Sequence, residues 1–156
     1  SDLPTSMVVD ALDRPLIGRG VGWYGDAVQV IEPAASGGWV PVGGGVSYPR
    51  RTSWVTAMAT LADGTVAFGG YFAKAGALDA PNLAVWNPIT QRYSTIGAGL
   101  AVEPDVLASS AFGTLYAATR VRSTSSSGTS RSSLGNSCLT AATTASSRLF
   151  TPPRAC

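Results

Sequence analysis

The chain carries an imperfect internal repeat of about 50 residues, and this repeat restricts its fold more than any other feature. The segment Ala62–Gly70 (ADGTVAFGG) aligns with Leu12–Gly20 (LDRPLIGRG) at an offset of 50, and with Ala111–Thr119 (AFGTLYAAT) at an offset of 49. Further along, Tyr93–Leu100 (YSTIGAGL) aligns with Trp39–Val46 (WVPVGGGV) at an offset of 54. Repeats of this length indicate similar structural units that pack against their neighbours in chain order.

The best-preserved copy, Trp54–Leu100, predicts four short antiparallel strands. Asp63-Gly64 is a strong hairpin signal, because glycine accepts the positive φ that a tight turn needs. Gly69-Gly70 indicates a close backbone approach or a bulge. The segment Tyr71–Pro81 is predicted to be a linker. The four expected strands are Val55–Leu61, Thr65–Phe68, Asn82–Trp86 and Tyr93–Ile96.

Four strands in each repeat of this length are typical of a β-propeller blade. No segment shows a sustained 3.6-residue apolar period, so the predicted fold class is all-β. A propeller closes with about four to eight blades, and this chain is therefore expected to be a fragment or a piece that associates. The expected division is a partial first blade at 1–46, a complete blade at 47–100, the start of a third blade at 101–121 and a low-complexity tail at 122–156.

The tail differs from the rest of the chain in composition and charge. Residues 121–156 contain ten serines and six threonines, and the five arginines after Thr119 are accompanied by no acidic residue. Such a segment buries too little apolar surface to offset chain entropy, so we expect it to be disordered. It suits either an O-glycosylated stalk or the product of a shifted reading frame or a truncation. Cys138 and Cys156 leave a local disulfide, an intermolecular disulfide and free thiols all open.

The glycine doublet Gly69-Gly70, followed by Leu83–Pro88 (LAVWNP) and Tyr93, resembles the kelch-type repeat. The wider string GGYFAKAGALDAPNLAVW…IGAGL is similar to the GGxFxxAG…NxAxW repeat of secreted and cell-surface propellers. Those propellers include the fungal cortical cell-polarity marker family and bacterial extracellular proteins. The likeness covers 54–100 well, is partial in 7–46 and is lost after Thr119. It implies a binding scaffold at or outside the cell surface, with no catalytic residues in the repeat itself.

The residues themselves argue against catalysis. Histidine is absent, so the commonest general base and metal ligand is missing. The aspartates are spread over different turns without calcium-loop spacing. Gly20–Gly25 (GVGWYG) fits a dinucleotide-binding string, but the alternating Ala27–Ile31 after it predicts a strand where that fold needs a helix. We expect no enzyme activity, no cofactor, no metal, no nucleic-acid binding and no membrane span.

Blade geometry suggests a binding surface. In a four-stranded meander, the loop between the second and third strands emerges on the same face as the link to the next blade. This places Gly22–Asp26, Tyr48–Arg51 and Tyr71–Pro81 on one rim. Aromatic and arginine side chains dominate binding hot spots, although Trp23 and Tyr24 also suit packing between blades. The candidate rim residues are Trp23, Tyr24, Tyr48, Arg50 and Arg51.

Three functions fit these observations. The first is a non-catalytic propeller module that binds a protein or a glycan at or outside the cell surface, with further blades or self-association completing the ring. The second is a fragment of an extracellular propeller enzyme whose catalytic residues lie outside this chain. The third is a truncated or frame-shifted product with no activity of its own.

Overall fold

The computed structural model describes residues 4–19, 30–120 and 137–143, and this part of the chain is all-β. Its only helical element is the single 3-10 turn η1 (Val42–Gly44). The strands form antiparallel sheets, three of which are meanders that follow one another along the chain. The all-β prediction is confirmed.

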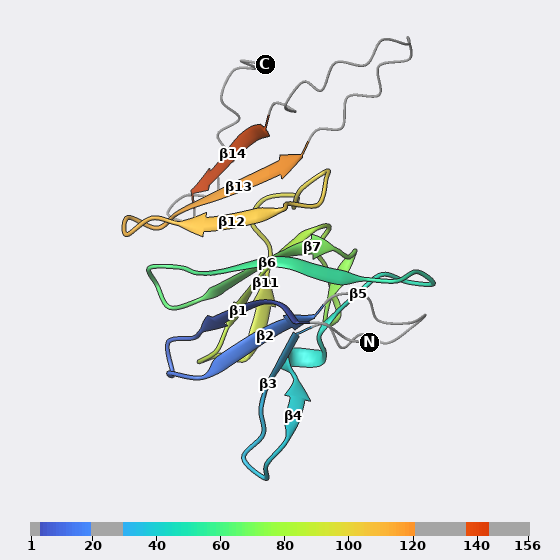
Figure 1. Ribbon diagram of the computed structural model, residues 1–156, viewed down its shortest axis with the longest axis vertical. Helices are drawn as coiled ribbons and strands as arrows, with labels where there is room; N and C mark the ends of the chain where they lie inside the picture. The colour runs from blue at the N-terminus through green and yellow to red at the C-terminus, as the bar shows by residue number, and fades with distance from the viewer. Residues whose placement is uncertain (1–3, 20–29, 121–136, 144–156) are drawn as a thin grey trace.

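The strand bounds show how each meander is built (Figure 1). The first sheet contains β1 (Pro4–Val9), β2 (Pro15–Arg19), β3 (Val30–Pro33) and β4 (Trp39–Pro41). The second contains β6 (Trp54–Thr60), β7 (Val66–Tyr71), β10 (Leu83–Asn87) and β11 (Arg92–Ser94). The third contains β12 (Val106–Ser109), β13 (Thr114–Arg120) and β14 (Ser137–Thr143), and a small side sheet contains β5 (Val46–Ser47), β8 (Lys74–Ala75) and β9 (Leu78–Asp79).

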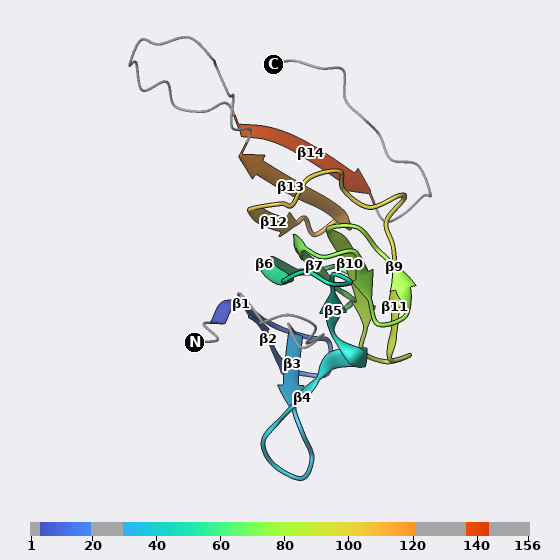
Figure 2. The ribbon, with the colours of Figure 1, turned by 90° about the vertical axis from the view of Figure 1, so that its right-hand side faces the viewer.

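The second sheet lies between the other two meanders, in both views of the ribbon (Figures 1 and 2). One of its faces presents Met58, Phe68 and Trp86 to the cluster that includes Leu16 of the first sheet. Its other face belongs to a second cluster, shared with the third sheet, whose members include Ala57, Ala67, Leu83, Val85, Leu107 and Leu115. Strands buried on both faces need continuous apolar runs, which explains the strings VAF and LAVW.

Hydroxyl groups join neighbouring sheets in the same way at both junctions. Thr5 and Thr56 are each an extra residue at a register shift in the first strand of their sheets. The Thr5 hydroxyl donates to the Val55 carbonyl, and the Thr56 hydroxyl donates to the Pro104 carbonyl. At the other end of these strands, Thr60 Oγ1 donates to the Val9 carbonyl at 2.8 Å and Ser109 Oγ donates to the Thr60 carbonyl at 2.6 Å. The hydrogen bonds between neighbouring sheets therefore repeat along the chain together with the strands.

The turn after each first strand also repeats, and it corrects the predicted alignment. Asp13, Gly64 and Gly113 occupy the same turn position with φ of 60°, 81° and 82°. Asp13 and Gly64 are 51 residues apart, and Gly64 and Gly113 are 49 residues apart. The offset between the first and second repeats is therefore 51, and the predicted value of 50 is wrong by one. Aspartate tolerates this left-handed conformation, so Asp13 can stand where the other two repeats have glycine. An alignment that matches glycine with glycine therefore misses this correspondence.

The glycine doublet serves two different close approaches. A Cβ on Gly70 would lie 2.1 Å from the Trp54 carbonyl oxygen, across the register shift in the neighbouring strand. A Cβ on Gly69 would lie 2.4 Å from Pro104, which belongs to the segment leading into the third sheet. The predicted close backbone approach is therefore confirmed, and the doublet sets the spacing both within a sheet and between sheets.

Two segments differ from their predictions. The expected linker Tyr71–Pro81 contributes the end of β7 and the β8–β9 hairpin, because β8 pairs with the strand that leaves the first meander, β5. Residues Ser137–Thr143 of the expected disordered tail form β14, which pairs with β13 in antiparallel register. An unpaired β13 edge offers backbone donors and acceptors that any extended segment can satisfy, whatever its side chains. Residues 121–136 and 144–156 of that tail lie outside the described residues.

Candidate binding site

Three aromatic rings form a ladder on the surface beside the start of β6. Tyr71 lies between the other two, with its ring centroid 5.0 Å from that of Tyr48 and 4.7 Å from that of Trp54. Both pairs are stacked, with interplanar angles of 15° and 25°. Trp54 and Tyr71 are cross-strand partners of β6 and β7, so the sheet itself holds these two rings together.

Arg51 extends the ladder at its outer end. Its guanidinium lies 5.3 Å from the centre of the Tyr48 ring, within range of a cation–π interaction. Nη1 of the same guanidinium donates a hydrogen bond of 3.2 Å to the Tyr71 hydroxyl. This hydrogen bond raises the pKa of Arg51, so the exposed end of the ladder carries a permanent positive charge.

Main-chain pairing brings these segments together. β5, just before Tyr48, pairs with β8, just after Tyr71. The Ala73 amide also donates to the Ser47 carbonyl at 2.9 Å. A link between sheets therefore runs beside the loop between the second and third strands, and the structure brings Tyr48 and Arg51 into the same cluster.

The other candidate residues are placed differently. Arg50 is exposed, with a φ of 62° in the turn closed by the Tyr48–Arg51 bridge. Trp23 and Tyr24 lie outside the described residues. Sequence reasoning did not include Trp54 and Tyr71 among the candidates. Their positions at the ends of a predicted hairpin, with Tyr71 directly after the glycine doublet, were the signal that could have identified them.

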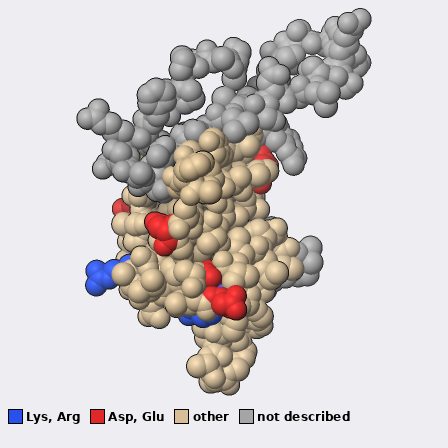
Figure 3. Space-filling view, turned by 90° about the vertical axis from the view of Figure 1, so that its left-hand side faces the viewer, with Lys and Arg blue, Asp and Glu red and all other residues tan. Residues whose placement is uncertain are grey.

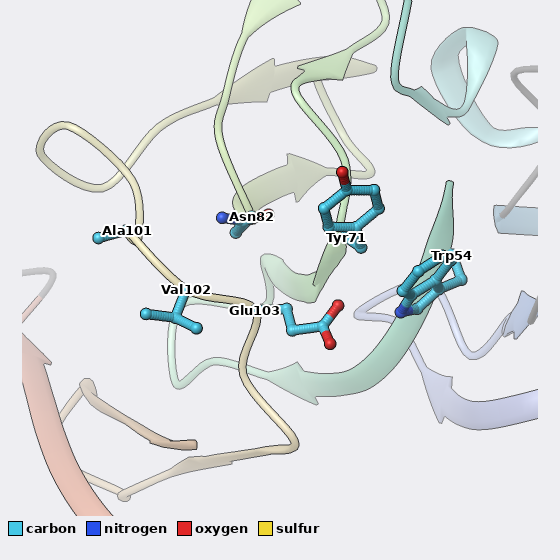
Figure 4. A pocket seen from close by; sticks show the side chains of 6 residues that line it. All are labelled: Trp54, Tyr71, Asn82, Ala101, Val102 and Glu103. Carbon is cyan, nitrogen blue, oxygen red and sulfur yellow. The ribbon is translucent and has the colours of Figure 1, made fainter. Parts of the chain in front are cut away.

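A groove opens beside the ladder, between the second and third sheets (Figure 4). It has a volume of about 330 Å³. Trp54 and Tyr71 form one wall, and the Glu103 side chain points toward the space between them and the opposite wall (Figure 4). The six lining residues are Trp54, Tyr71, Asn82, Ala101, Val102 and Glu103.

The polar groups of the groove differ in how well they are satisfied. Nδ2 of Asn82 donates to the Leu100 carbonyl at 2.9 Å, which fixes the side chain. Oε2 of Glu103 is buried and has no hydrogen-bond partner among the described residues. Buried polar atoms of this kind are uncommon and call for a partner or a function. The groove can therefore accept a donor while its aromatic and aliphatic walls contact apolar atoms.

The acidic and cysteine residues of the described part of the chain do not gather in groups of three or more that could hold a metal ion. On the face shown in Figure 3, acidic and basic side chains are scattered among uncharged residues. The aromatic ladder and the groove together present stacked rings, one guanidinium and one carboxylate.

Comparisons with known proteins returned no match: neither a protein-family model, nor a curated protein sequence, nor a solved structure is similar to this chain. Among the described residues, no helix is long and apolar enough to cross a lipid bilayer.

Proposed function

We propose that this chain is a non-catalytic module of kelch-like β-propeller repeats that binds a protein or a glycan at or outside the cell surface. The observation that carries the proposal is the repeated junction between sheets. Thr5 donates across one junction to Val55 in the first strand of the second sheet, and Thr56 donates across the next junction to Pro104, just before the third sheet. Thr60 and Ser109 donate back across the same two junctions. When each sheet contacts the next through the same hydrogen bonds, further sheets can be added in the same way until a ring closes.

The aromatic ladder supports the binding part of the proposal. Tyr48, Trp54 and Tyr71 keep their rings in fixed positions through stacking and strand pairing. Rigid aromatic side chains provide large contact areas at low conformational cost, and together with arginine they are enriched at binding hot spots. Arg51 adds a charged group to the same surface.

The proposal is tested by direct binding. The fluorescently labelled chain is applied to a glycan array and to intact cells, and saturable binding to one of them is expected. The double variant Tyr48→Ala with Arg51→Ala should weaken that binding at least about tenfold, as truncation of a hot spot does. Ile89→Ala, at an exposed turn between β10 and β11, serves as the control and should bind normally. No saturable binding on either surface, or equal binding by all three proteins, would refute the proposal.

A further inference from the structure

We propose that the groove between the second and third sheets binds a basic side chain, lysine or arginine, of a protein partner. This inference rests on the proposed binding function and specifies the class of ligand. The observation behind it is the juxtaposition of the Glu103 carboxylate with the Trp54 and Tyr71 rings in one groove (Figure 4). A carboxylate and aromatic faces are the two kinds of group that attract an organic cation.

Glu103 supplies the charge for this interaction. A buried carboxylate oxygen without a hydrogen-bond partner is costly, because its lost hydration is not replaced. Oε2 of Glu103 is in this position among the described residues. An ammonium or guanidinium group in the groove would attract the Glu103 carboxylate, and rotation of that side chain would bring Oε2 to the cation in a charge-assisted hydrogen bond.

The walls match the rest of a basic side chain. Ala101 and Val102 line the groove opposite the aromatic wall and offer apolar contacts to a methylene stem. Trp54 is the ring of this wall that can meet a cation near Glu103, because Tyr71 is stacked against both Tyr48 and Trp54. A neutral sugar would need several free hydrogen-bonding groups, whereas the Asn82 amide already uses one hydrogen on Leu100 and the Tyr71 hydroxyl already accepts from Arg51. The lining therefore favours a basic side chain over a sugar.

Arg51, the cationic residue of the ladder, does not occupy the groove. The Arg51 guanidinium is held by the Tyr48 ring and the Tyr71 hydroxyl. Tyr48 and Trp54 stack on Tyr71 from either side, so Arg51 stays at the Tyr48 end of the ladder while the groove is at the Trp54 end.

The experiment titrates the chain with N-acetyl-lysine methylamide and N-acetyl-arginine methylamide. Binding is followed by NMR through the Trp54 indole N–H and the Val102 methyl groups. N-acetyl-norleucine methylamide, which lacks the charge, is the ligand control. Glu103→Gln keeps the shape of the side chain and removes its charge. Asp79→Asn removes one charge from an exposed residue that pairs with Lys74, and is the protein control.

We expect at least one cationic probe to shift both reporters, with norleucine at least about tenfold weaker. Glu103→Gln should weaken cation binding about tenfold, and Asp79→Asn should leave it unchanged. Equal shifts by all three probes, or equal affinity in both variants, would overturn the inference. Shifts at the same reporters produced by cellohexaose and not by the cations would also overturn it, while leaving the proposed binding function intact.

Discussion

At the scale of single residues, Tyr93 shows how one side chain connects two units. Its hydroxyl donates to the Val42 carbonyl at 2.7 Å, and this bond links β11 to η1. Its ring contacts Trp86 with a centroid separation of 4.8 Å and meets Phe68 edge to face at 6.1 Å. Burial, followed by the nearby negative charge of Glu32, raises the pKa of Tyr93 well above its usual value. The buried hydroxyl is therefore held in its neutral form.

This raised pKa predicts a loss of stability in alkali. Above about pH 10 the tyrosine of the unfolded chain ionises while Tyr93 in the folded chain stays protonated, so the free energy of unfolding should fall by up to about 1.4 kcal/mol per pH unit. Tyr93→Phe should be about 1 kcal/mol less stable at pH 7 but should lack this slope. Urea unfolding from pH 8 to pH 11 measures both quantities. An equal slope in the two proteins would contradict the assignment to Tyr93.

At the scale of the element, the register shift in β6 contributes to the contact between the second and third sheets. The extra residue, Thr56, places its hydroxyl within reach of the Gly69 carbonyl in its own sheet and the Pro104 carbonyl at the next one. Thr5 holds the corresponding place in β1. Each shift therefore turns a threonine toward the following sheet, in line with the use of bulges to redirect a side chain.

Replacing this hydroxyl with a methyl group should weaken the junction. Thr56→Val preserves the shape of the side chain, removes the donor and leaves the Pro104 carbonyl without it, at an expected cost of about 1–2 kcal/mol. Thr95→Val, at an exposed residue after β11, should change the free energy of unfolding by less than about 0.5 kcal/mol. Urea titrations of the two variants beside the parent chain provide the comparison. Similar stability of both variants would mean that the hydroxyl does not stabilise the junction.

At the scale of the whole molecule, the outer face of the first sheet is the counterpart of a face that is buried in the second sheet. Met7 occupies the repeat position of Met58, and Ile17 that of Phe68, yet Met7 is 66% exposed and Met58 only 8%. Apart from Arg19 at the end of β2, strand register points apolar residues to this outer face. These residues are Met7, Val9, Pro15, Ile17, Ile31, Pro33, Trp39 and Pro41.

An apolar face of this kind predicts association. We expect the chain to be oligomeric at micromolar concentration, and Met7→Lys with Val9→Lys should shift it toward monomer by at least about tenfold in dissociation constant, because a buried charge is costly. Ile89→Lys adds a charge at a 73% exposed turn residue and should not change the mass. Light scattering coupled to size-exclusion chromatography measures the mass of each protein. A monomeric parent chain, or equal masses for all variants, would show that the face stays open.

Much of the fold was predictable because its signals are local. Asp63-Gly64 specifies a hairpin turn by backbone conformation alone, and the run Leu83–Trp86 is apolar enough to indicate a strand buried on both faces. The first repeat offset was predicted incorrectly because Asp13 adopts a glycine-like φ that composition does not reveal. The last strand of the third meander, β14, was not predicted, because pairing at a sheet edge depends on backbone groups rather than on a side-chain pattern.

The groove beside Trp54 depends on tertiary packing. Tyr48 and Arg51 were predicted to lie on one rim, since meander geometry alone brings their segments together. Glu103, in contrast, lies 49 residues after Trp54 and meets it only because the third sheet packs against Gly69. Local sequence sets turns, strands and apolar faces, because these depend on a few neighbouring residues. Which side chains share a groove depends on how one sheet seats on the next, and that is settled only when the two faces pack.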